Sequence, residues 1–155
     1  MSFFQVGRSP IMTNNSKVLA LKYRPQTFKD LIGHEEIATT IYNSIKNNSS
    51  ANAFLFTGIR GIGKTTFARI VAKALNCEQA LEGKCEKNCS HCEPIANSNH
   101  IDVLEMDAAS KTGVDDVREL IEFSRYPPTV AMFKIFIIDE VHMLSKQAFN
   151  ALLKK

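Results

Sequence analysis

The first group of residues able to do chemistry is a glycine-rich stretch. Gly58 to Thr65 reads GIRGIGKT, with an apolar run before it and a helical pattern after it. This order is typical of a phosphate-binding loop. Its glycines let the backbone turn tightly, so that several N–H groups meet one polyphosphate at the positive end of the next helix. We expect phosphate contacts from Gly58, Ile59, Arg60, Gly61, Ile62, Gly63, Lys64, Thr65 and Thr66.

Two side chains at the end of this loop have distinct expected roles. Lys64 would reach the β- and γ-phosphates, and the Thr65 hydroxyl would bind Mg²⁺. The alternative is a glycine-rich turn whose lysine meets no ligand. The apolar run before the loop and the helical pattern after it favour the phosphate-binding interpretation.

A pair of acidic residues completes the expected site. Asp139 and Glu140 end the apolar run IFIIDE, and ligands of open parallel sheets bind beyond the carboxyl ends of strands. Asp139 would orient Mg²⁺ through its water shell, and Glu140 would polarise the attacking water as general base. Acids at a strand end can also be solvated loop residues, but the phosphate-binding loop makes these two its expected partners.

The second chemical group consists of all 4 cysteines, gathered in CEQALEGKCEKNCSHC. A reducing compartment disfavours disulfides, and the pair in CSHC alone could be redox-active. Four cysteines in a polar loop between a helix and a strand fit a closed, structural tetrathiolate zinc site better. One metal ion could fold a segment too polar to pack by itself. The expected ligands are Cys77, Cys85, Cys89 and Cys92.

Helical patterns and short apolar strands alternate along the chain, which predicts an α/β protein with a parallel sheet. Strands are expected in AFLFTG, IDVLEMDA and FKIFIIDE. The expected helices cover Glu35 to Asn47, Lys64 to Asn76, a segment after Thr112, and a segment after Ser145, which is the expected N-cap.

Several of these motifs together resemble a known family. The segments GIRGIGKTTFARIVAKALNC, DVLEMDAASKTGVDDVREL and FKIFIIDEVHMLSKQAFNALLK are similar to the gamma/tau family of bacterial DNA polymerase III subunits. LALKYRPQTFKDLIGHE also resembles the segment of AAA+ clamp loaders that closes over adenine and ribose. The resemblance runs from about Lys17 onward and keeps the family order of motifs.

This resemblance implies a fold, a function and further site residues. It implies a P-loop NTPase of the AAA+ class, with three layers and a parallel sheet, carrying a small zinc-binding insertion at about residues 77–92. It implies ATP binding and hydrolysis that load a sliding clamp on primed DNA with other clamp-loader subunits, in a hetero-oligomer. The subunit is part of a DNA-directed DNA polymerase without polymerising nucleotides itself. Tyr23, Arg24 and Pro25 would line the base and sugar, and zinc would bind through four cysteines.

The chain departs from the family pattern in its cysteine spacing and at its C-terminal end. Cys85 and Cys89 are separated by three residues where the family usually has two, so His91 is a possible substitute ligand. The chain ends at NALLKK, where the family continues into a strand, a lid and an oligomerisation domain. Residues 17–155 are therefore expected to form an incomplete nucleotide-binding domain with weak or no turnover of its own.

DNA contact is a separate expectation. Lys111, the N–H groups around Thr112 to Val114 and Arg118 could engage phosphate, as the similar family segment does in the assembled loader. Asp115 and Asp116 oppose this and are also ordinary first-turn acids of a helix. Two other functions stay open, namely an assembly module that binds nucleotide without turnover and another P-loop DNA-dependent ATPase.

Composition limits the remaining classes. The chain has 155 residues and a formal net charge of +3, which suits one globular domain and is too small to indicate nucleic acid by itself. No apolar stretch is long enough to span a bilayer, so we expect no membrane partner and a cytoplasmic protein. Residues 1–16 are expected to be a disordered extension, and Met12 is an alternative start.

Overall fold

A computed structural model describes residues 23–59, 61–86, 88–110 and 114–153. The expected N-terminal extension, residues 1–16, lies outside these ranges. A short 3₁₀-helix, η1 (Phe28–Asp30), is followed by α2 (Glu35–Lys46), α3 (Lys64–Asn76), α4 (Glu78–Leu81) and α5 (Cys92–Ala96). The C-terminal half contains β1 (Val103–Asp107), α6 (Val114–Ser124), β2 (Ile135–Asp139), η2 (Val141–Met143) and α7 (Lys146–Leu153).

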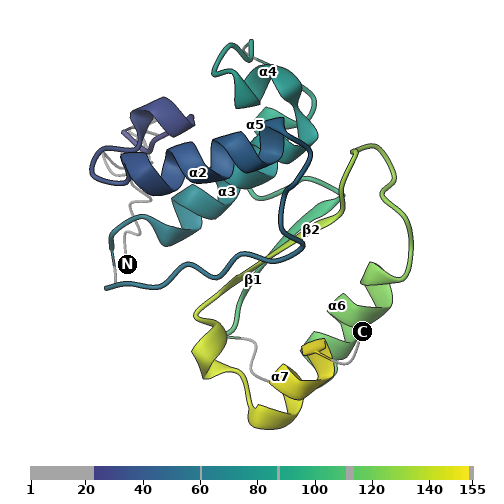
Figure 1. The fold of residues 1–155 in the computed structure, drawn as a ribbon. Coiled ribbons are helices and arrows are strands. Elements are labelled where there is room, and N and C mark those ends of the chain that lie inside the picture. Colours follow the sequence, from purple (N-terminus) through teal and green to yellow (C-terminus); the bar gives the residue numbers. More distant parts are fainter. Residues whose placement is uncertain (1–22, 60, 87, 111–113, 154–155) are drawn as a thin grey trace, which may run out of the picture.

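The two strands form a parallel sheet at the centre of the molecule (Figure 1). Val103 is paired with Ile135 and Asp107 with Asp139, so both strands end in an aspartate at the same edge. Side chains alternate between the two faces of a strand. Ile137 accordingly packs in a cluster with Ala72 of α3.

The opposite face of the sheet is covered by the last helices. Met106 of β1 lies in a buried cluster with Val117 of α6 and Ala148 of α7. The sheet thus separates α3 and α5 from α6 and α7, which gives the helix, sheet and helix layers expected of an α/β protein (Figure 1).

The expected helices form where apolar residues recur at helical spacing. Ala38, Ile41 and Ile45 are the buried stripe of α2, and acids in its first turn complement the helix dipole. Its stripe packs against Phe67 and Ile70 of α3 in a third cluster. Ser145 caps α7 as predicted, since its hydroxyl accepts the Ala148 N–H at 3.2 Å.

One expected strand is absent from the sheet. Residues 53–57, in AFLFTG, form no strand in the described chain, and the sheet pairs only β1 with β2. The apolar run is used differently, because Phe54 and Phe56 pack against the cluster of α2 and α3 while Leu55 is 75% exposed. The packing of these two phenylalanines thus holds the segment in place without hydrogen bonds to a neighbouring strand. The prediction of a strand here is wrong.

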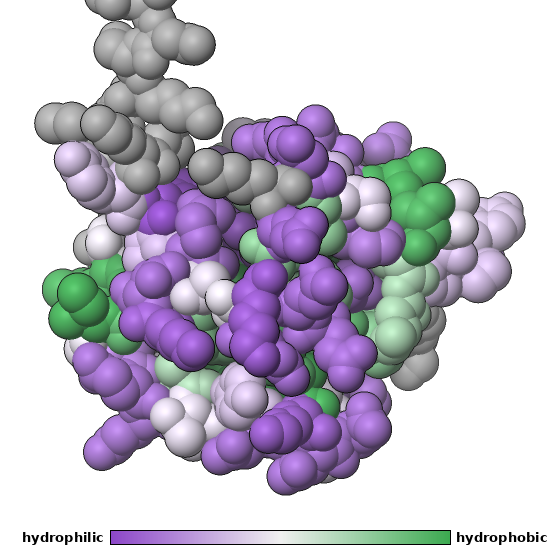
Figure 2. All heavy atoms as spheres, turned by 90° about the horizontal axis from the view of Figure 1, so that it is seen from above, coloured by the Kyte–Doolittle hydropathy of each residue, from purple (hydrophilic) through white to green (hydrophobic). Residues whose placement is uncertain are grey.

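The surface carries its exposed apolar side chains in patches. Figure 2 shows a face that is mainly hydrophilic, with hydrophobic atoms gathered toward two of its edges. None of the described helices is long and apolar enough to cross a membrane.

Candidate functional site

The glycine-rich loop leads directly into α3. Gly63 precedes the helix with φ of 93°, a left-handed conformation that glycine adopts without steric cost. The Lys64 ammonium donates to the carbonyl oxygens of Gly58 at 2.9 Å and Ile59 at 3.0 Å. The lysine therefore lies over the loop that was predicted to hold a polyphosphate.

The structure brings Thr65 and Asp139 together from distant parts of the sequence. The Thr65 hydroxyl at the start of α3 donates to Asp139 Oδ2 at the end of β2, at 2.5 Å. A hydroxyl and a carboxylate are hard oxygen ligands of the kind that Mg²⁺ prefers. The donor chemistry of this pair fits the predicted ion.

Glu140 holds an uncommon backbone conformation beside this pair. Its φ of 50° and ψ of 39° are left-handed, which few non-glycine residues adopt and which is found at functional sites. Its N–H donates to Asp139 Oδ1 at 2.9 Å, so the turn fixes both acids relative to each other. His142 Nε2 lies 3.5 Å from Glu140 Oε2, a contact that the sequence did not indicate.

The segment predicted to close over a base and sugar lies beside α3. Arg24, Pro25 and Gln26 line a cavity of about 10 Å³ together with residues of that helix, Thr66 and Ile70 among them. Tyr23 is 73% exposed. The structure therefore places Arg24 and Pro25 next to the helix that follows the phosphate loop.

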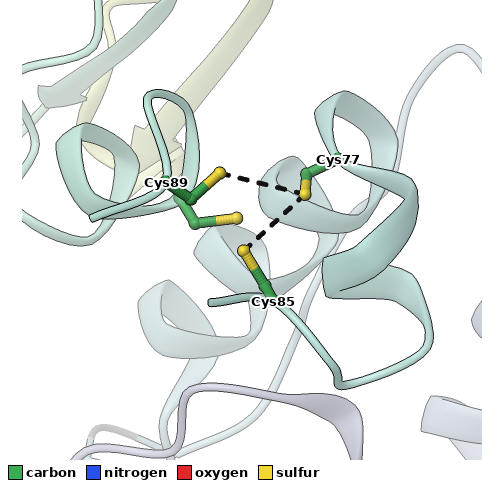
Figure 3. Close-up of side chains that lie close together, drawn as sticks. Cys77, Cys85 and Cys89 are labelled. Carbon is green, nitrogen blue, oxygen red and sulfur yellow. Dashed lines mark hydrogen bonds between the residues drawn. The ribbon is translucent and has the colours of Figure 1, made fainter. Parts of the chain in front are cut away.

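The four cysteines converge beyond the other end of α3. Their Sγ atoms all lie within 4.8 Å of one another. Figure 3 shows Cys77 Sγ facing Cys85 Sγ at 3.8 Å and Cys89 Sγ at 4.0 Å. A tetrahedral site with Zn–S bonds of about 2.3 Å has sulfurs about 3.8 Å apart, so this donor set fits zinc. A disulfide needs sulfurs about 2.05 Å apart, and all four cysteines are free.

The thiols differ in how readily they lose a proton. Burial and neighbouring thiols raise the pKa of Cys92, and burial raises the pKa of Cys85 to about 11. Burial acts in the same direction on Cys89, but the backbone N–H groups of Cys92 and His91 outweigh it and lower the Cys89 pKa to about 7. Since metals bind thiolates, the lowered pKa favours the metal-binding form of Cys89 near neutral pH.

His91 is not part of the sulfur cluster. Its Nδ1 lies 3.0 Å from His100 Nε2, and His100 Nδ1 accepts the Asp102 N–H at 3.0 Å. Because Nδ1 of His100 is an acceptor, its Nε2 carries the proton and donates to His91. The histidine predicted as a substitute ligand is thus occupied by a second histidine, and the set of four cysteines is complete without it.

Two acids that sequence reasoning missed, one fully buried and one partly buried, hold these elements in place. The fully buried Asp102 carboxylate accepts three backbone N–H bonds from residues 129–131, just before β2. Arg69 of α3 makes a bidentate pair with Glu105 of β1, at 2.8 Å and 2.6 Å. Burial acts to raise the pKa of Glu105, but Arg69 outweighs it and lowers that pKa.

The predicted DNA-contacting segment is mostly outside the described residues. Lys111, Thr112 and Gly113 are not among them. Arg118 lies on α6 with an exposed side chain and pairs with Asp115 at 3.0 Å. The described residues do not test DNA contact, which stays a prediction.

Comparison with known proteins decides the family. A family model described as "DNA polymerase III, delta subunit" matches residues 33–155. The chain belongs to this clamp-loader family. The family model describes an AAA+ domain, which agrees with the layers of helices on both sides of a small parallel sheet in this chain. The resemblance to gamma/tau subunits is confirmed by curated relatives.

Two relatives show the extent of the similarity. The DNA polymerase III subunit tau/gamma of Haemophilus influenzae is 49% identical over 89% of this chain and 20% of its own length. The subunit gamma of Buchnera aphidicola subsp. Baizongia pistaciae is 50% identical over 90% of this chain and 38% of its own. The chain therefore spans between about a fifth and two-fifths of the length of these relatives.

Proposed function

We propose that this clamp-loader family member is the ATP-binding part of a DNA polymerase III gamma/tau subunit. The observation that carries the proposal is the 2.5 Å contact between Thr65 and Asp139, which joins the phosphate loop to the acidic strand end. ATP would bind at the Gly58–Thr66 loop, with Tyr23, Arg24 and Pro25 at the base and sugar. Thr65 and Asp139 would hold Mg²⁺, which supplies charge neutralisation on the phosphates.

The chain's own groups have separate roles in hydrolysis. Lys64 would move from the carbonyls of Gly58 and Ile59 to the phosphate oxygens, where its charge is stabilising. Glu140 would accept the proton of the attacking water, and the turn that bonds its N–H to Asp139 holds the two carboxylates in register. Zinc on the four cysteines would be structural, because a closed tetrathiolate site has no open position for chemistry.

The work of the whole protein is also part of this proposal. The names of the relatives indicate a subunit of the DNA polymerase III holoenzyme. We infer that the full-length protein acts with other clamp-loader subunits, the sliding clamp and primed DNA, in the cytoplasm. Family membership favours this role over another P-loop DNA-dependent ATPase.

One structural observation favours a second candidate, a nucleotide-binding module without turnover. Residues 53–57 lead into the phosphate loop but are not hydrogen-bonded into the sheet that carries Asp139. The loop and the acidic residues are thus joined through side chains and α3 rather than through one continuous sheet. Binding can tolerate such a connection more easily than catalysis, which needs sub-ångström placement.

Calorimetric titration of the chain with ATP and Mg²⁺ tests both candidates. Lys64→Ala should weaken binding at least tenfold, whereas Lys46→Ala, which removes an exposed lysine of α2, should leave it within about twofold. Binding unaffected by Lys64→Ala would contradict the site. Phosphate release then separates the candidates, because turnover abolished by Glu140→Gln identifies an ATPase and binding without release identifies the module.

A further inference from the structure

A chain of hydrogen bonds joins the cysteine segment to the central sheet. His91 lies between two of the cysteines in CSHC, and its Nδ1 is 3.0 Å from His100 Nε2. His100 precedes β1, and only 6% of its surface is exposed. Its other ring nitrogen accepts the Asp102 N–H at 3.0 Å. The Asp102 carbonyl accepts the Ile135 N–H of β2 at 2.8 Å, so this chain of bonds ends on the sheet.

The direction of these bonds is set at the end that lies on the sheet. A backbone N–H can only donate, so Nδ1 of His100 is an acceptor and Nε2 carries the hydrogen. His91 Nδ1 is then the acceptor of the bond between the two rings. Burial and His91 outweigh Asp102 and lower the pKa of His100, which favours the neutral ring that this pattern requires. The backbone of Asp102 therefore orients both imidazoles.

His91 lies inside the turn that carries two of the expected metal ligands. The Glu93 N–H donates to the Cys89 carbonyl at 3.2 Å, and the Ile95 N–H donates to the His91 carbonyl at 3.1 Å. Cys92, the next residue, is the first residue of α5. A fixed His91 ring therefore restricts the backbone between Cys89 and Cys92, and with it the directions of their side chains.

These two cysteines need such support more than the first cysteine does. Cys77 directly follows α3, a helix of 13 residues, whereas Cys92 belongs to α5, a helix of 5 residues. So short a helix is not stable by itself. Ile95 packs α5 against Ala72 of α3, but apolar contact has no preferred direction, whereas a hydrogen bond does. The histidine pair supplies the directional contact.

We propose that His100 is a positioning residue of the four-cysteine metal centre. Through its bond to His91, it holds the CSHC turn in the orientation in which Cys89 and Cys92 face the other two sulfurs. This role rests on the proposed zinc site and is independent of ATP binding. It makes metal affinity depend on a buried residue that lies outside the cysteine segment.

Zinc affinity of the chain, measured by competition with a chelator, tests the proposal. Residues that hold metal ligands in place typically change metal affinity by about 10–100-fold, so His100→Leu and His91→Leu should each weaken zinc binding by that factor. His100→Gln keeps an N–H donor near the place of Nε2 and should bind zinc within about threefold of the wild type. Ser90→Leu is the matched control, because Ser90 is an exposed residue of the same turn. Its zinc affinity should stay within about twofold of the wild type.

A double variant distinguishes a shared role from two separate losses. The chain with both His91→Leu and His100→Leu should bind zinc about as weakly as either single variant, because each change removes the same bond. Additive losses would overturn the role of His100. So would zinc binding by both single variants within about twofold of the wild type, or equal weakening by His100→Leu and His100→Gln.

One outcome concerns the zinc site itself, since a wild-type chain that binds no zinc would overturn both that site and this role. Should His100→Leu lose the wild-type circular dichroism, His91→Leu and His91→Asn give the same comparison, because asparagine keeps an acceptor at the place of Nδ1. Equal weakening by these two variants would then overturn the proposal.

Discussion

Replacing Asp102 with asparagine should destabilise the fold by about 2–4 kcal/mol. The carboxylate accepts the Thr129 N–H at one oxygen, 2.7 Å away, and the Val130 and Ala131 N–H groups at the other, 2.8 and 2.9 Å away. An amide oxygen can keep the last two bonds, but its NH₂ group then faces the Thr129 N–H. The bond from the Thr129 N–H is lost, and the bonds from Val130 and Ala131 remain but no longer go to a charged acceptor. A hydrogen bond to a charged group is worth about 1.5–3 kcal/mol.

The titration of Asp102 leads to a similar magnitude. Burial acts to raise the pKa of this carboxyl, but the three backbone N–H bonds outweigh it and lower the pKa from 3.8 to about 2. A shift of this size corresponds to roughly 2 kcal/mol. Because the folded pKa is the lower one, the stabilisation is complete above pH 3.8 and is lost as the pH falls toward 2.

Urea unfolding of the chain is the assay. With a dependence of about 2 kcal/mol per molar urea, Asp102→Asn should lower the midpoint by about 1–2 M at pH 7. Asp115→Asn makes the same chemical change at an exposed residue and should leave the midpoint almost unchanged. The difference between wild type and Asp102→Asn should shrink between pH 4 and pH 2. Equal midpoints for Asp102→Asn and Asp115→Asn at pH 7 would refute the reasoning.

Three further predictions concern the candidate sites. Glu140→Gln should leave the ATP dissociation constant within about threefold while lowering any hydrolysis by about 10²–10⁴-fold, and a parallel loss of binding would argue against a general base. Adding a zinc chelator should lower the melting temperature of the wild-type chain but not that of Cys77→Ser. Zinc affinity should decrease as the pH is lowered, because protons compete with the metal for the thiolates. No effect of the chelator on the wild-type melting temperature would exclude a structural metal. Arg69→Met and Glu105→Gln should each cost about 1–3 kcal/mol with a favourable coupling energy in a double-mutant cycle, and additive effects would mean that the pair is not coupled.

The four longer helices, α2, α3, α6 and α7, and the two observed strands could be predicted because their signals are local, whereas the short α4 and α5 lie in the cysteine segment that was expected to be a loop. Helical apolar spacing predicts the bounds of α2 and α3 to within a residue. The serine that opens SKQAF, directly before the helical pattern, indicates the N-cap at Ser145. The contact between Thr65 and Asp139 was also foreseeable, since each ends a motif with a known position in a parallel sheet.

The parts that sequence reasoning missed depend on partners far along the chain. Residues 53–57 have a strand's composition, but a strand also needs a neighbouring backbone, and composition does not reveal one. Asp102, with its isoleucine and valine neighbours, looked like an ordinary strand residue, because the N–H groups it accepts are 27 to 29 residues away. Lys73 belonged to a helix with a polar face, and only the packed structure shows that it is buried.

Helix α3 connects the two candidate sites, so a distortion of this helix would affect both. Its 13 residues form a rod of about 20 Å, with Lys64 and Thr65 at one end and Cys77 immediately beyond the other. A substitution that bends this rod near its middle, such as proline at Ala72, whose side chain is fully buried, would displace metal ligands and phosphate ligands together. We therefore expect zinc binding at the proposed cysteine site and nucleotide binding at the proposed phosphate loop to report on each other in variants of this chain. A variant that loses only one of the two should be damaged at the corresponding end of α3.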